Sequence, residues 1–204
     1  MDALLIFFIT TAASVIGSLQ AGIVNTAVLA HTVKRGPEAG RRMALGGSIP
    51  EFIYAGIAFH FASWLLGVMG IDAHGVALLV GSILILLGLY FAFLFKPVFD
   101  LDQVNVKATG VRKGFLLGML NPQLIIFWSG VRLMLDTLGI TRFGWIETIA
   151  FGLGAFTGAL VLLLQLVRLG RRALEKWRPS TLLLLFRVVG GALVLSGAIM
   201  IMNA

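Results

Sequence analysis

The sequence contains no cysteine and few charged residues. Without cysteine, a disulfide framework, a thiolate metal site and membrane thiol-redox chemistry are all excluded. Charged residues make up 12% of the 204 positions, whereas soluble domains carry about 25%. Hydrophobic residues make up 59%, and the mean hydropathy is +1.00. This composition predicts an integral membrane protein whose main solvent is lipid.

The net charge of +7 does not take the form of a basic domain. A nucleic-acid-binding protein needs its basic residues gathered on one solvated face. Here the basic residues fall in three short clusters between apolar segments, a pattern that orients a membrane protein. The clusters are Lys34, Arg35, Arg41 and Arg42; Lys96, Lys107, Arg112 and Lys113; and Arg168, Arg171, Arg172, Lys176 and Arg178. The sequence therefore predicts the lipid bilayer as a partner and no nucleic acid.

Six apolar segments are each long enough for the ~20 residues that a membrane-spanning helix needs. They cover about residues 3–30, 43–68, 75–95, 113–135, 145–168 and 181–202. The sequence thus predicts an all-α membrane protein with six transmembrane helices in a single domain, residues 1–204. The basic clusters lie in alternate connections, which places these connections in the cytoplasm and both termini outside. The opening M-D-A-L-L-I-F-F has no positive n-region or cleavage site, so we expect it to begin the first helix.

Two pairs of similar stretches indicate an internal repeat. G-S-I-L-I-L-L-G at 81–88 is similar to G-G-A-L-V-L-S-G at 190–197, and G-S-L-Q at 17–20 is similar to G-M-L-N at 118–121. With three helices in each half, the second half enters the membrane in the opposite direction. The sequence therefore indicates an inverted 3+3 repeat, which is common among secondary transporters.

The segment Gly114–Gly130 carries Asn121, Pro122 and Gln123 within an apolar run. Proline leaves a backbone carbonyl without its donor, and side-chain amides need hydrogen-bond partners in hydrocarbon. This combination predicts a broken helix that forms half of a substrate site near the membrane midplane. A kink that serves packing alone is the other interpretation. The first helix is expected to supply the second half of the site through Gln20, Gly22 and Asn25.

Glu51 lies in the second helix directly after Pro50. It is about eight residues, or ~12 Å, past the cytoplasmic end of that helix. An acid at this depth is by default a functional-site hypothesis. Two roles follow from the sequence. Glu51 is either a proton carrier or the partner of Arg187 in a structural ion pair, because Arg187 is the basic residue nearest to it in depth.

The remaining polar residues predict no catalytic centre. Arg132 and Asp136 are four apart in the fourth helix, which favours a local ion pair. His60 has no second ligand at useful spacing and is expected at the membrane interface. Asp100 and Asp102 lack the glycine turn and distal glutamate of a calcium loop, so we expect a solvated connection. No nucleophile with a neighbouring base occurs, so the sequence predicts neither an enzyme nor a cofactor or metal site.

Four stretches carry a family resemblance. They are G-S-L-Q-A-G-I-V-N-T-A-V-L at 17–29, K-R-G-P-E-A-G-R-R at 34–42, A-L-G-G-S-I-P-E-F-I-Y-A at 44–55 and G-F-L-L-G-M-L-N-P-Q-L-I-I-F-W at 114–128. Together they resemble the LysE/RhtB family of amino-acid exporters. The resemblance covers nearly the whole chain and is most specific at L-N-P, residues 120–122. The P-E-F-I-Y-A around Glu51 is similar to a divergent subgroup.

The resemblance implies a multi-pass carrier of the bacterial inner membrane that exports amino acids or similar small polar metabolites by alternating access. It implies a proton or ion gradient as the driving force, and it leaves a homodimer open as the assembly. Family members carry a proline-glycine motif in the first helix, and only the glycine, Gly22, is kept here. A cation exporter that uses Glu51 and the amides as oxygen ligands is one alternative, and a non-catalytic membrane accessory subunit is another.

Overall fold

The structure is a computed structural model of the chain. It describes residues 2–19, 22–69, 73–94, 110–121, 123–137, 140, 144–170 and 179–202. Every regular element within these residues is a helix, so the predicted all-α fold is confirmed. The elements are α1 (Asp2–Gly17), α2 (Ile23–Arg35), α3 (Pro37–Met69), α4 (Ala73–Leu89) with its π-helical extension η1 (Tyr90–Leu94), α5 (Val111–Met119), α6 (Gln123–Thr137), α7 (Trp145–Leu169) and α9 (Pro179–Met202).

Two of the six apolar segments form broken helices. The first segment is divided into α1 and α2, and the fourth into α5 and α6. α3 begins at Pro37, six residues before the predicted segment, because proline at the first helical position lacks only an N–H that has no partner inside the helix. Gly36, with a φ of 94°, separates α2 from α3. A side chain is strongly disfavoured at this φ, so glycine suits the tight turn between the two helices.

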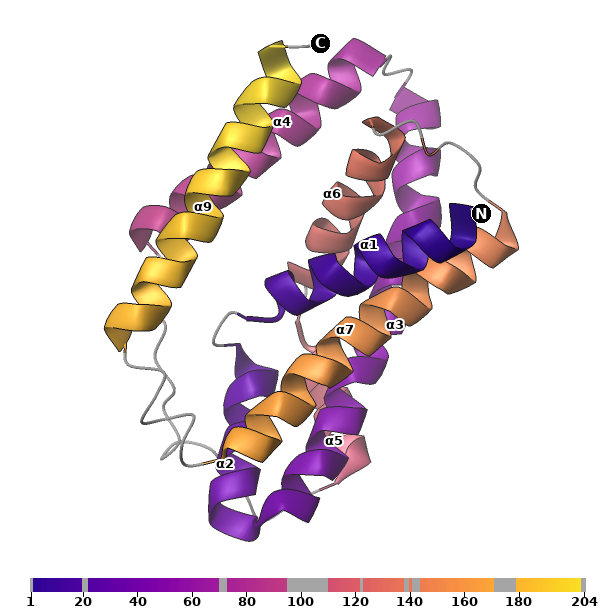
Figure 1. Cartoon of the computed structure of the whole chain (residues 1–204). Helices are drawn as coiled ribbons and strands as arrows, with labels where there is room; N and C mark the ends of the chain where they lie inside the picture. Colours follow the sequence, from indigo (N-terminus) through magenta and orange to yellow (C-terminus); the bar gives the residue numbers. More distant parts are fainter. Residues whose placement is uncertain are drawn as a thin grey trace.

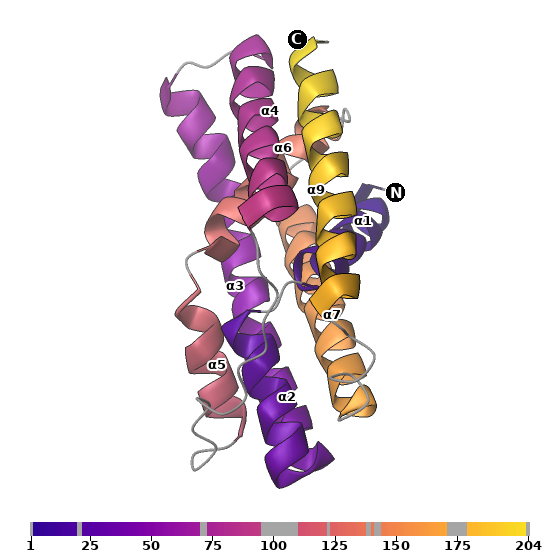
Figure 2. The ribbon, with the colours of Figure 1, turned by 90° about the vertical axis from the view of Figure 1, so that its left-hand side faces the viewer.

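Two long helices, α3 and α7, pack against each other through the middle of the molecule (Figure 1). α1 lies across α7, and α5 lies along the lower part of α3. α4 and α9 run side by side as a separate pair in both views (Figure 2). α6 contacts both α3 and α4 and so connects this pair to the rest of the bundle.

Glycines allow the helix backbones to approach closely at two crossings. Where α5 meets α3, a Cβ on Gly114 would collide with the carbonyl oxygen of Met43. Where α1 meets α7, a Cβ on Gly158 would collide with the carbonyl oxygen of Thr11. Close backbone approach through small residues is typical of helix packing in membranes, where lipid removes the hydrophobic driving force for association.

The α4–α9 pair is held together by the glycines of two similar stretches. Gly88 faces Gly190, and a Cβ on either residue would lie 2.5 Å from the carbonyl oxygen of the other. Gly81 faces Gly197 in the same way, with clashes at 2.8 and 2.5 Å. The first glycine of each stretch therefore meets the last glycine of the other. The two helices are consequently antiparallel and in close backbone contact.

The buried side chains form two clusters along the bundle. The upper cluster draws on α1, α3, α6 and α7, and the lower cluster on α2, α3 and α7. The upper one contains Ile6, Ala55, Ala58, Phe59, Leu124, Trp128, Val131, Leu135, Phe151 and Ala155. The lower one contains Ala27, Val28, Met43, Ala44, Leu163, Leu166 and Val167.

One described helix, α7, is long and apolar enough to cross a membrane. The bent pair α5–α6 adds a second if the two helices count as one span. A buried core helix of a soluble protein meets the same criterion. Length and composition of the described helices therefore support a membrane location only weakly.

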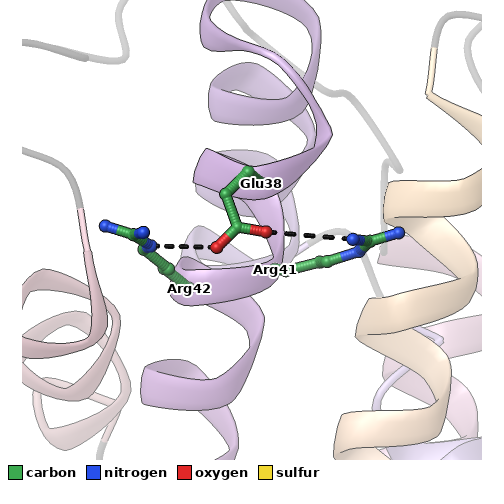
Figure 3. A network of polar contacts seen from close by, with 3 residues as sticks. All are labelled: Glu38, Arg41 and Arg42. Atoms are coloured by element: carbon green, nitrogen blue, oxygen red, sulfur yellow. Dashed lines mark hydrogen bonds and ion pairs between the residues drawn. The ribbon is translucent and has the colours of Figure 1, made fainter.

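Basic side chains gather at one end of the bundle. The end of α2, the start of α3, the start of α5 and the end of α7 all lie at the lower end in Figures 1 and 2. These helix ends carry Lys34, Arg35, Arg41, Arg42, Arg112, Lys113 and Arg168. Glu38 pairs with Arg42 at 3.0 Å and with Arg41 at 3.8 Å (Figure 3). All three side chains are exposed, so these pairs contribute little stability.

Candidate functional site

The break between α5 and α6 is built around Asn121. The two helices meet at an angle of 71°. The Asn121 side-chain oxygen accepts a hydrogen bond from the Gln123 backbone N–H at 3.2 Å, which caps the start of α6. The Asn121 backbone N–H donates to the Gly118 carbonyl at 3.1 Å, which closes the end of α5. One residue thus satisfies backbone groups on both sides of the bend. Pro122 itself lies outside the described residues.

A tyrosine from α3 pairs with the carbonyl that this break releases. In an unbroken helix the Met119 carbonyl would accept from the Gln123 N–H, four residues later. That N–H is engaged by Asn121, and the Tyr54 hydroxyl donates to the Met119 carbonyl at 2.7 Å instead. The bent backbone is therefore held by a side chain 65 positions away in the sequence.

The break between α1 and α2 is organised in a similar way. In an unbroken helix the Ser18 carbonyl would accept from the Gly22 N–H. Gly22 has an extended backbone before α2, and the Asn25 side chain donates to the Ser18 carbonyl at 2.6 Å. The Gly22 carbonyl accepts from both the backbone N–H and the hydroxyl of Thr26. Ser18 and Met119 occupy the same position in the two similar stretches, 17–20 and 118–121.

Glu51 is hydrogen-bonded to a buried tryptophan of α6. The Glu51 carboxylate accepts from the Trp128 indole N–H at 2.7 Å. Trp128 is fully buried, and its ring meets Phe151 of α7 edge-on at 5.4 Å. Glu51 as a residue is half-buried. Its carboxylate is therefore held at the edge of an aromatic cluster.

The segment 50–54 of α3 contacts the bent pair α5–α6 through three residues. Pro50 packs where a Cβ on Gly118 would clash, Glu51 binds Trp128, and Tyr54 binds the Met119 carbonyl. Glu51 and Tyr54 are three residues apart and therefore project from one face of α3. The acid and the second break thus belong to one site.

The first break approaches the same site from α1. Gly17, the last residue of α1, packs against the ring of Phe127, and a Cβ there would lie 2.5 Å from the ring. Phe127 directly precedes Trp128 in α6. The end of α1 at the first break therefore contacts the first half of α6, next to the tryptophan that binds Glu51.

The residues predicted from the sequence are distributed unequally over this site. Glu51, Asn121, Gly22 and Asn25 lie at the two breaks or beside them. Gln123 begins α6 with its side chain exposed. Arg187 is exposed on α9 and lines a surface groove, so the structure does not bring it to Glu51, whose partner is Trp128. Gln20, like Pro122, lies outside the described residues.

Tyr54, Trp128 and His31 were not selected from the sequence. Tyr54 holds the second break and Trp128 holds Glu51. The three-residue spacing of Tyr54 from Glu51, which places both on one face of a helix, is the signal that could have found Tyr54. Arg132 is buried, with its guanidinium 4.8 Å from the centre of the Phe59 ring; the Asp136 side chain lies outside the description. His31 is buried in α2, with Nδ1 2.7 Å from the Ala27 carbonyl oxygen. His60 is exposed beside Thr148 and Trp145, in keeping with an aromatic edge of the bundle.

Glu51 lines neither of two surface grooves found on the described part of the chain. One, of about 540 Å³, runs between α3 and α7 past His60 and Trp145. The other, of about 810 Å³, runs between α4–η1 and α9 past Arg187. Within the described residues no group of three His, Asp or Glu side chains is placed to hold a metal ion.

Comparisons of this chain with protein-family models, with curated proteins and with solved structures gave no match.

Proposed function

We propose that this protein is a secondary carrier that exports amino acids or similar small polar metabolites across the bacterial inner membrane. In this proposal the chain spans the membrane six times and consists of two inverted halves. The substrate site lies between the two helix breaks, with Glu51 as the proton-carrying residue. The observation that carries the proposal is the pair of broken helices beside a hydrogen-bonded acid.

The two breaks support a transport site because each one leaves a backbone carbonyl without its helical hydrogen bond inside an apolar bundle. At each break one carbonyl has lost its helical donor and is held by a single side-chain donor, Asn25 for Ser18 and Tyr54 for Met119. Discontinuous helices of this kind provide carbonyls and helix ends for polar substrates in many secondary transporters. A polar solute that supplies its own donors is able to replace Asn25 or Tyr54 at these carbonyls.

Part of the helix packing supports the inverted repeat, although among the described residues the α2–α3 and α4–α6 contacts lack exchanged counterparts of comparable extent. Exchanging the two halves converts the α1–α7 contact into the α5–α3 contact, and both are present. The same exchange relates α3–α6 to α2–α7, and α1–α6 to α2–α5, which are also present. In the α4–α9 pair the exchange converts the Gly81–Gly197 contact into Gly190–Gly88. Two halves related in this way are able to rock about a common site, which is the basis of alternating access.

The charge distribution supports the orientation. Basic residues at the lower end are expected in the cytoplasm by the positive-inside rule. Glu51 lies beyond that end along α3, where a carboxylate in a mostly apolar bundle needs a function or a partner. Its hydrogen bond to Trp128 fits a carboxyl group that is held in one position while it exchanges a proton between two states of the carrier.

The decisive experiment is flux in proteoliposomes that contain the purified protein. We expect labelled amino acids to move faster when a pH gradient is applied, and Glu51→Gln to abolish this acceleration. Glu38→Gln is the matched control, because Glu38 is an exposed acid on the same helix and pairs only with surface arginines. If Glu51→Gln transports as fast as the wild type under the gradient, Glu51 is not the proton carrier.

The same preparation separates the alternative functions. Saturable binding of a divalent cation that Glu51→Gln removes would favour a cation exporter. Co-purification of a second protein in fixed ratio, without flux of any solute in the panel, would favour an accessory subunit.

A further inference from the structure

The groove between η1 and α9 is lined by apolar residues and one charged residue, Arg187. Its volume is about 810 Å³. Leu89 and Phe93 form one wall, and Val194, Leu195 and Ala198 form the other. Arg187 lies at one end of the groove with its side chain exposed. The groove is therefore shaped for an apolar chain with an anionic group at one end.

Arg187 needs an anion from outside these helices. The described residues of α4, η1 and α9 include no Asp or Glu. Within the described part of the chain, no carboxylate lies within ion-pair distance of Arg187. A guanidinium on a lipid-facing helix is costly unless it finds a counter-ion or reaches the interface. A second copy of the chain docked by the same helices would bring no acid to it.

Arg187 lies in the half of α9 nearer to Pro179, from which its long side chain is able to reach back toward the headgroups at that end. It lies eight residues after Pro179, or ~12 Å along the axis, at 1.5 Å per residue. Helical side chains tilt toward the helix N-terminus, so the guanidinium extends back toward the Pro179 end. From Arg187 to Ala198 the groove follows α9 for ~16 Å, which is close to half of the ~30 Å hydrocarbon core.

We propose that this groove binds an anionic phospholipid, with the phosphate on Arg187 and one acyl chain along α9 toward Ala198. Arginine suits this role because its planar fork binds phosphate oxygens in pairs. Basic pockets between membrane helices on the cytoplasmic side are suited to anionic headgroups in the same way. The proposal rests on the membrane location proposed above, and it is independent of what the carrier transports.

Adjacent glycines make the groove testable without disturbing the helix pair. A Cβ on Gly191 would meet no atom within 4 Å, so a larger side chain there enters the groove. A Cβ on Gly190 would clash with the Gly88 carbonyl oxygen at 2.5 Å. Gly191→Leu is therefore expected to fill the acyl-chain path and leave the α4–α9 contact intact. Gly56→Leu is the matched control, because Gly56 is equally open and lines the other groove.

The experiment measures lipid retention by the purified full-length protein, using native mass spectrometry with phosphatidylglycerol and phosphatidylcholine in equal amounts. We expect the wild type to retain phosphatidylglycerol preferentially. Arg187→Gln should weaken this preference by about tenfold, the size expected for one lost charge-assisted contact. Arg187→Lys should keep part of it. Gly191→Leu should reduce retention of both lipids, and Gly56→Leu should leave retention unchanged.

Several results would overturn the proposal. Equal retention of both lipids by the wild type, or an unchanged preference in Arg187→Gln, would show that the headgroup is not bound there. Loss of bound lipid on adding inorganic phosphate alone would identify a free-anion site instead. A dimer that Gly191→Leu dissociates would assign the groove to a second copy. Protein that alkaline carbonate strips from membranes would contradict the membrane location itself, which is a separate failure.

Discussion

At the scale of single residues, the proposed function depends most on the contact between Glu51 and Trp128. A carboxylate in a mostly apolar bundle is stabilised when a fixed donor meets it. The indole N–H is such a donor, because Trp128 is fully buried and packed edge-on against Phe151. The tryptophan therefore sets the position of the acid relative to the bent helix pair. If Glu51 exchanges a proton during transport, loss of this donor should change the exchange as well as the stability.

Trp128→Phe tests this interaction while keeping most of the aromatic packing. Removing the donor from a charged acceptor is expected to lower the free energy of unfolding by about 1.5–3 kcal/mol. The measurement is chemical unfolding of the detergent-solubilised protein. Trp145→Phe is the control, because Trp145 is 77% exposed and should leave the stability unchanged. Equal effects of the two substitutions would show that the hydrogen bond to Glu51 contributes nothing specific.

Tyr54→Phe tests whether the released carbonyl at Met119 needs its donor. The variant leaves that carbonyl with no donor from Tyr54 and should lose about 1–3 kcal/mol of unfolding free energy. Thr11→Val is the control. It removes a hydroxyl–carbonyl bond of the same 2.7 Å length, but the Phe7 carbonyl lies inside α1 and keeps its helical donor. We expect that change to stay within about 0.5 kcal/mol. The prediction fails if the two hydroxyls prove equally important.

At the scale of helices, the two breaks were foreseeable and their partners were not. Glycine and an asparagine-proline pair weaken a helix locally, so the sequence pointed to Gly22 and Pro122, and helix boundaries occur at both places. The capping of Ser18 by Asn25 spans only seven residues. By contrast, Tyr54–Met119 and Glu51–Trp128 span 65 and 77 residues. Contacts between residues so far apart in the sequence depend on how whole helices pack. The hydrophobic periodicity of the sequence does not specify that packing.

The same reasoning accounts for Arg187. From the sequence, Arg187 was paired with Glu51 because both lie at a similar distance, counted in residues, from the cytoplasmic ends of their helices. Depth says nothing about which helices are neighbours. α9 packs on α4 and η1, so Arg187 lies in a groove on a different side of the bundle from Glu51.

Adjacent glycines in α9 give a test of the α4–α9 contact. Gly190→Ala should destabilise the protein by about 1–3 kcal/mol, because the new methyl overlaps the Gly88 carbonyl and forces the helices apart. Gly191→Ala should be neutral or stabilising by up to about 1 kcal/mol, since alanine favours a helix and the site is open. Thermal unfolding of the two variants in one detergent makes the comparison. If Gly190→Ala lowers the stability less than Gly191→Ala does, the two helices do not approach each other closely at Gly190.

At the scale of the whole molecule, the charge distribution is consistent with the inverted repeat that we propose. The helix ends at the lower end carry basic residues from both halves, α2–α3 from the first and α5 and α7 from the second. An inverted repeat places the α1–α2 and α5–α6 breaks at similar depth but with opposite direction. A site between them is then equally distant from both membrane surfaces, as alternating access requires.

This arrangement predicts which end of α7 faces the cytoplasm, and the absence of native cysteine makes the test direct. Trp145 begins α7 and Arg168 lies in its last turn, and both side chains are exposed. In intact cells, Trp145→Cys should react with a membrane-impermeant maleimide. Arg168→Cys should react only after the membrane is permeabilised. The cysteine-free wild type supplies the unlabelled baseline. Labelling of both positions in intact cells would mean that α7 does not cross the membrane, whereas the reverse pattern would leave the span intact and invert the carrier.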